Sequence, residues 1–94
     1  MSYSFVVNIL ESVFSVDVGF DDLEAQAALK RILNDPAQRV IIERELLCLY
    51  NDESISWVKL LDNEDYVVYP ADDDDDAKSY MTSIFWNQVF PRGN

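Results

Sequence analysis

The chain of 94 residues contains no histidine, one cysteine and two glycines. Without histidine, the chain lacks the commonest general base, the commonest metal ligand and every nucleophile that a histidine activates. The single cysteine, Cys48, excludes a disulfide within the chain, and the isolated glycines, Gly19 and Gly93, cannot form a glycine-rich phosphate-binding loop. We therefore expect no catalytic activity, no cofactor and no metal site.

Long apolar runs are also missing. The longest covers residues 46–50, whereas a membrane-spanning helix needs about 20 apolar residues. The first residues lack the basic region of a secretory signal, and Asn8 and Glu11 interrupt their apolar run. A lone cysteine in an apolar segment is typical of a buried thiol in a reducing compartment. These features predict no membrane contact and a cytoplasmic location.

Basic residues are few, with 7 lysines and arginines against 18 acidic residues and a net charge of −11. Residues 51–94 carry ten of the acidic residues and only three of the basic ones. Such a charge repels nucleic acid and anionic membranes and attracts basic proteins. We therefore expect a basic protein as the partner and no direct contact with nucleic acid.

One domain over residues 1–94 is expected, because compact domains usually contain about 100–150 residues. Apolar residues make up 49% of the chain and aromatic residues 13%, which is enough for a packed core. Three segments have the apolar spacing of helices: 21–33, 36–50 and about 75–89. Asp21 or Asp22 can cap the first, and Asp35 followed by Pro36 suits the start of the second.

The remaining segments are less regular. Residues 5–14 have helical spacing, while alternation over residues 14–18 also allows a short strand. Alternating residues predict a strand over 55–60, followed by a polar turn and a second arm that completes a hairpin by residue 69. Residues 57–61 equally allow a helical turn, which is the alternative to this hairpin. Residues 91–94 are expected to fray. The predicted fold is α+β, with three or four helices and a short β-hairpin; the alternative is an all-α bundle.

Acidic and aromatic residues lie close together in the sequence, from the predicted hairpin to the start of the last helix. Carboxylates steer a cationic partner, and tyrosines provide the contacts that carry affinity. Solvated surface is the alternative role for the carboxylates. Counted from Asp72, the sixth and twelfth positions hold Ala77 and Ser83, so the run does not match an EF-hand loop. The candidate partner-binding residues are Asp62, Glu64, Asp65, Tyr66, Tyr69, Asp72, Asp73, Asp74, Asp75 and Asp76.

In size, charge and the alternation of acidic and aromatic residues over 64–69 and 72–76, the chain resembles the small acidic immunity proteins of bacterial toxin–immunity pairs, in particular those of contact-dependent growth inhibition. The resemblance implies a cytosolic, non-catalytic protein that neutralises one cognate basic toxin, a nuclease, by covering its active site or substrate-binding surface. It also implies a monomer when free and a 1:1 heterodimer with the toxin. The alternative function is a nucleic-acid mimic or an acidic adaptor subunit for another basic protein.

Overall fold

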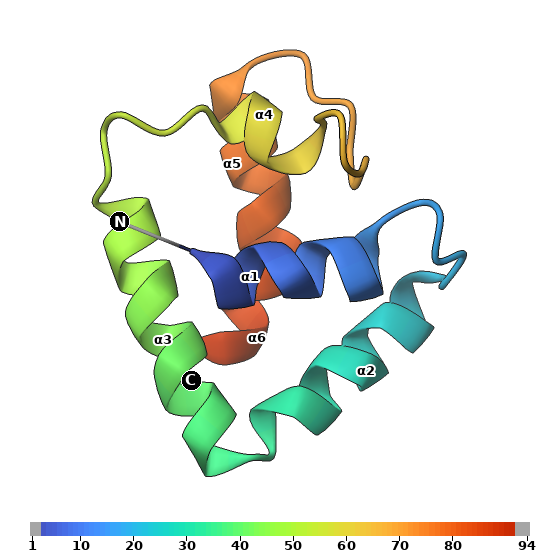
Figure 1. The fold of residues 1–94 in the computed structure, drawn as a ribbon, viewed down its shortest axis with the longest axis vertical. Helices are drawn as coiled ribbons and strands as arrows, with labels where there is room; N and C mark the ends of the chain where they lie inside the picture. Colours follow the sequence, from blue (N-terminus) through green and yellow to red (C-terminus); the bar gives the residue numbers. More distant parts are fainter. Residues whose placement is uncertain (1–2, 92–94) are drawn as a thin grey trace.

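Aspartate caps begin the two long central helices of the computed structural model, which describes residues 3–91. Helix α2 spans Asp22–Leu33, and the Asp21 carboxylate accepts the Glu24 backbone N–H at 2.8 Å. Helix α3 spans Pro36–Tyr50, and the Asp35 carboxylate accepts the Ala37 backbone N–H at 3.0 Å. Both predicted helices are confirmed. The short connection between them produces the V that α2 and α3 form in Figure 1.

The first helix is capped by a side chain from another helix. Helix α1 spans Ser4–Ile9 and continues as a π-helical segment, η1, over Leu10–Phe14. The two Glu45 carboxylate oxygens accept the backbone N–H groups of Phe5 and Val6 at 3.2 and 2.9 Å. The helical interpretation of residues 5–14 is therefore confirmed. The strand alternative for 14–18 is wrong, because the chain turns after Phe14.

The predicted hairpin over 55–69 is wrong. Residues Trp57–Leu61 form helix α4, and Ser56 caps it by accepting the Lys59 backbone N–H. The pairing expected of a hairpin is reduced to one isolated bridge, Asp62 to Val67. Trp57, Leu60 and Leu61 share one helical face and are buried, and this burial outweighs the alternating pattern. The all-α alternative therefore fits the described residues.

The last predicted helix is confirmed but is not a continuous α-helix. It starts as α5 over Asp74–Met81, continues as a π-helical segment, η2, over Thr82–Trp86, and ends as α6 over Asn87–Val89. Met81 and Phe85 are fully buried. Residues 92–94 of the predicted tail lie outside the described residues.

These helices enclose one core. In Figure 1, α1 crosses in front of the α5–α6 segment between the arms of the V. The radius of gyration is 12.5 Å, against about 12.4 Å expected for a compact domain of this length. Within the described part of the chain, no helix has both the length and the apolar character needed to cross a bilayer. The core contains residues from every α-helix, among them Val6, Leu29, Leu46, Leu61, Met81 and Val89.

A hydrogen bond joins the start of α1 to the segment after α3. The Tyr3 hydroxyl donates to the Asp52 carboxylate at 2.7 Å. This bond raises the pKa of Tyr3 from 10.0 to about 12. Hydrogen bonds from Ser54, followed by the one from Tyr3, lower the pKa of Asp52 from 3.8 to about 2.

The bond needs a neutral tyrosine and an ionised aspartate, so its pH range can be predicted. Because the folded pKa of Tyr3 is raised, its contribution to stability is complete below pH 10 and is lost as the pH rises toward 12. Because the pKa of Asp52 is lowered, its contribution is present above pH 4 and is lost as the pH falls toward 2. In an absorbance titration of tyrosinate, Asp52→Asn should shift one tyrosine to lower pH. An unchanged curve would contradict the bond.

Candidate functional site

Three of the five consecutive aspartates hold the fold together. Asp73 caps α5 by accepting the Asp76 backbone N–H at 2.8 Å. The Asp74 carboxylate accepts the Val58 backbone N–H in the first turn of α4 at 3.0 Å. Asp76 accepts the Tyr69 hydroxyl and the Asp72 backbone N–H, each at 3.1 Å. The carboxylates of the exposed Asp72 and Asp75 make no hydrogen bond within the described residues, so these two are available to a partner.

The two predicted tyrosines differ in exposure. Tyr66 is 5% exposed, and its hydroxyl donates to the Leu60 carbonyl at 2.8 Å. It is part of the core and cannot provide an exposed anchor. Tyr69 is half-buried, and its ring stacks on that of Tyr80 with centroids 4.0 Å apart and planes 4° apart. Its hydrogen bond to Asp76 raises the pKa of Tyr69.

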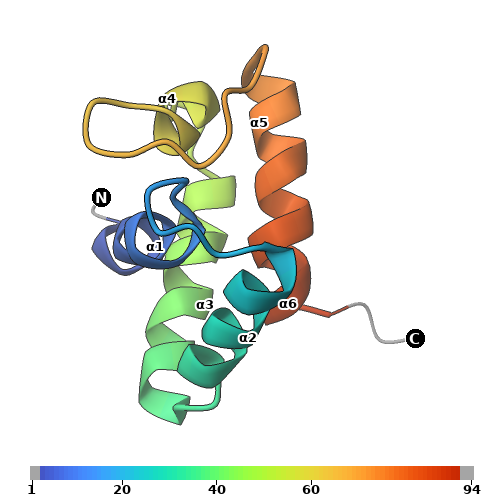
Figure 2. The ribbon, with the colours of Figure 1, turned by 90° about the vertical axis from the view of Figure 1, so that its right-hand side faces the viewer.

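The predicted carboxylates lie in two separate groups. Asp62, Glu64 and Asp65 belong to the loop after α4, which reaches away from α5 in Figure 2. Glu64 and Asp65 are exposed, and Asp62 is half-buried. The aspartates 72–76 lie at the start of α5, beside the stacked tyrosines. The structure therefore brings Tyr69 together with the second group only.

An apolar groove lies beside the stacked tyrosines. It has a volume of about 390 Å³ and is bounded by η1, the loop after it, the first turns of α2, and η2. In Figure 2 this loop crosses the front of the molecule toward α2. The Val16 backbone N–H donates to the Val67 carbonyl at 2.8 Å, which ties the loop to the segment before Tyr69. The apolar part of the lining consists of Val13, Phe14, Val16, Phe20, Ala25, Val68 and Ile84.

Two large apolar side chains in the lining of this groove are exposed. Val16 is 61% exposed and Phe20 is 44% exposed. Exposed apolar side chains that gather beside a groove are typical of interaction sites. Both π-helical segments contribute to the lining, and π-helical turns occur frequently at functional sites. The groove is therefore the strongest candidate for a binding site.

The groove also has a polar side, which consists of Ser15, Asp22, Gln26, Tyr80 and Ser83. Asp22 is the one carboxylate in this lining, and no lysine or arginine lines it. Burial, followed by the charge of Asp22, raises the pKa of Tyr80. Tyr80 also stacks on Tyr69. Through this pair, the groove adjoins the carboxylates at the start of α5.

Sequence reasoning missed the groove. Phe14 and Val16 belong to the alternating pattern that allows a short strand over residues 14–18, and Phe20 follows it. A loop can expose such residues when a glycine lets the chain turn, and Gly19 has a φ of 78°. Two features of the sequence indicate an exposed apolar loop here. The apolar residues do not follow helical spacing, and they are followed by Gly19 and by the helix cap Asp21.

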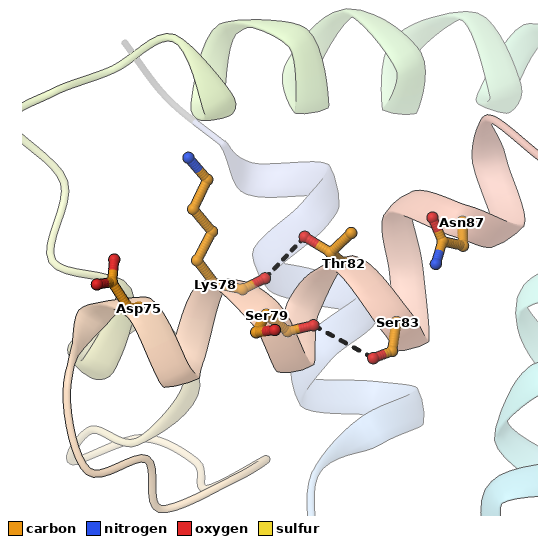
Figure 3. Close-up of a pocket in the computed structure, with 6 residues that line it drawn as sticks. All are labelled: Asp75, Lys78, Ser79, Thr82, Ser83 and Asn87. Atoms are coloured by element: carbon orange, nitrogen blue, oxygen red, sulfur yellow. Dashed lines mark hydrogen bonds between the residues drawn. The ribbon is translucent and has the colours of Figure 1, made fainter. Parts of the chain in front are cut away.

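A second, polar surface runs along α5, η2 and α6 and is lined by Asp75, Lys78, Ser79, Thr82, Ser83 and Asn87. Figure 3 shows that the Thr82 and Ser83 hydroxyls donate to the carbonyls of Lys78 and Ser79. The Lys78 ammonium lies 5.5 Å from the ring centroid of Tyr50 and 5.6 Å from that of Trp57. The Ser83 hydroxyl thus bonds to its own helix, whereas the Thr82 hydroxyl also shares a hydrogen bond of 2.9 Å with the Tyr50 hydroxyl on α3. Asp75 is the one carboxylate that lines this surface.

The acidic side chains are mostly without cationic partners. Over residues 3–91, the ion pair between Arg39 and Glu43, at 2.8 Å, is the one salt bridge formed. No group of three or more carboxylates or thiols in that range could hold a metal ion. The negative charge around the groove is therefore left to attract a cation from outside the chain.

The two roles of the aspartates can be separated by substitution. Asp74→Ala should lower the free energy of unfolding by about 1 kcal/mol, because the start of α4 loses a capping acceptor. Asp75→Ala removes the same charge from the same turn but no hydrogen bond, so it should leave stability almost unchanged. Urea unfolding of both variants measures the difference, and equal losses would contradict the structural role of Asp74.

Comparison of the chain with protein-family models gives no match. Comparisons with curated proteins and with solved structures also give no significant match. The geometry of the groove and the charge around it are therefore the basis for a functional assignment.

Proposed function

We propose that this chain is a non-catalytic immunity protein that binds and neutralises a cationic nuclease toxin. The observation that carries the proposal is an apolar groove with Asp22 in its wall, beside carboxylates that have no cationic partner in the described part of the chain. Apolar contacts surrounded by charge are the usual composition of a specific protein interface. A basic protein surface is the complement of this arrangement.

Two groups of residues have different tasks in this proposal. Phe20 and Val16 supply apolar area that leaves water on binding, so they determine how slowly the complex dissociates. Asp72 and Asp75 remain at the surface, so they accelerate the approach of a cationic partner. Tyr66 has no part in the interface, because it is buried in the core.

An acidic protein can inhibit a nuclease because the surface of the nuclease that binds its substrate is positively charged. Such an enzyme binds the phosphates of its substrate with lysine and arginine side chains. Carboxylates of the inhibitor pair with the same side chains, and the bulk of the helical domain excludes the nucleic acid. No covalent bond is made or broken. A 1:1 complex in the cytoplasm is sufficient for this inhibition. The resemblance implies that the toxin belongs to a contact-dependent growth-inhibition system.

The adaptor and nucleic-acid-mimic functions have less support. A mimic needs carboxylates in a row at the spacing of phosphates, whereas the carboxylates here form two groups, and Asp73, Asp74 and Asp76 bind the chain's own hydrogen-bond donors. No single observation favours either alternative over an inhibitor with a compact binding face.

The proposal is tested by capture of the partner with tagged protein from the cells that produce it. The wild type should retain one basic protein at high salt, and that protein should degrade RNA or DNA until one equivalent of the inhibitor is added. Phe20→Ser should speed dissociation, whereas Leu47→Ser should not. Leu47 is a matched control because it is 49% exposed, against 44% for Phe20, and lies on α3, outside the groove.

A partner without nuclease activity, or one whose activity is unchanged by binding, would overturn the proposed function. Equal effects of the Phe20 and Leu47 substitutions would overturn the location of the binding face. Thermal unfolding of both variants must be two-state, so that loss of the fold is not mistaken for loss of binding.

The surface aspartates should act on the association rate. The double variant Asp72→Asn, Asp75→Asn should slow association with the captured partner several-fold at low salt, because two steering charges are lost. The difference should disappear at high salt, where such charges are screened. Stopped-flow mixing measures the rate at both ionic strengths. An effect confined to dissociation would contradict the steering role.

A further inference from the structure

The chemistry of the apolar groove restricts what can enter it. Its volume of about 390 Å³ is near the lower end of the ~300–1,000 Å³ typical of sites that enclose an organic group. Phe14, Phe20 and Ile84 form apolar walls, and Asp22 supplies the one carboxylate in the lining. A ligand that fills the groove must therefore match a lining that is partly apolar and partly polar and that carries a single negative charge.

A purely apolar group does not meet this requirement. If it covered Asp22, the carboxylate would lose water without gaining a hydrogen bond or a counter-charge, which is unfavourable. An anionic group is excluded more strongly, because no lysine or arginine lines the groove and the chain carries a net charge of −11. A cation on an apolar stem satisfies both the walls and the carboxylate.

We propose that the groove receives an arginine side chain of the partner, whose stem lies on Phe14 and Phe20 and whose guanidinium pairs with Asp22 against the Tyr80 ring. This inference rests on the proposed function only in that the arginine belongs to a basic protein.

The aromatic wall favours arginine over lysine. One face of the Tyr80 ring is covered by Tyr69, at a centroid distance of 4.0 Å, so the groove can use only the other face or the edge. A guanidinium is planar, weakly hydrated and able to stack on such a ring while it donates two hydrogen bonds to one carboxylate. An ammonium group is compact and strongly hydrated, so it loses more when it leaves water.

The first turn of α2 holds the Asp22 carboxylate in place. Asp21 is occupied as the helix cap, in a reciprocal pair of hydrogen bonds with Glu24. Asp22 follows in the first helical turn, and no hydrogen bond within the described residues uses its carboxylate. The helix thus positions Asp22 at the groove while Asp21 satisfies the backbone, and the Asp22 carboxylate remains available for a cation.

The test uses the purified protein and a capped tripeptide with arginine between two leucines. In NMR spectra of ¹⁵N-labelled protein, this peptide should cause saturable shifts of backbone amides in residues 15–22 and 80–84. The same peptide with citrulline, which is neutral and nearly the same shape, should bind at least about tenfold more weakly, because a charge-assisted contact is lost. A peptide with lysine in place of the arginine should bind more weakly than the arginine peptide and more tightly than the citrulline peptide.

Asp22→Asn should weaken binding of the arginine peptide by a similar factor, while Glu53→Gln, which also removes one negative charge but from an exposed position outside the groove, should not. Equal binding of the citrulline peptide, equal effects of the two substitutions, or no saturable shift up to the solubility limit of the peptide would overturn the proposal. Because the toxin is absent from this experiment, its outcome is independent of whether the partner is a nuclease.

Discussion

Hydrogen bonds from backbone N–H groups to carboxylates are the interaction on which this fold depends. With 18 acidic and 7 basic residues, most carboxylates cannot find a cation, and helix starts supply the N–H donors that they need. Asp21, Asp35 and Asp73 cap their own helices. Glu45 and Asp74 do the same for α1 and α4 across the fold, and thereby join elements that are distant in sequence.

This use of carboxylates divides the acidic residues into two classes. Those that accept N–H or hydroxyl groups stabilise the domain, as Asp74 and Asp76 do. Those without such donors, including Asp22, Asp72 and Asp75, create a field that no internal cation cancels. The same composition therefore caps the helices of the domain and leaves negative charge at its surface, and neighbouring residues at the start of α5 belong to the two classes.

Sequence reasoning located only part of the candidate site. Tyr69 and the aspartates beside it adjoin the candidate groove through Tyr80, and their role in binding stays a prediction. Tyr66 has the same sequence features as Tyr69, yet its hydroxyl reaches the Leu60 carbonyl and its ring is buried. Phe20 and Asp22 were assigned no binding role, because their meeting with Tyr80 across the groove depends on contacts far apart along the chain.

The sequence by itself determined the net charge, the absence of histidine chemistry and the helices α2, α3 and α5, because caps and apolar spacing act within a few residues of each other. The tertiary structure alone decided α4 and the apolar groove. A helix of only five residues, Trp57–Leu61, is too short to be stable from local interactions. It exists because Asp74 satisfies its first turn and the core covers Trp57, and neither contact is encoded near residue 57.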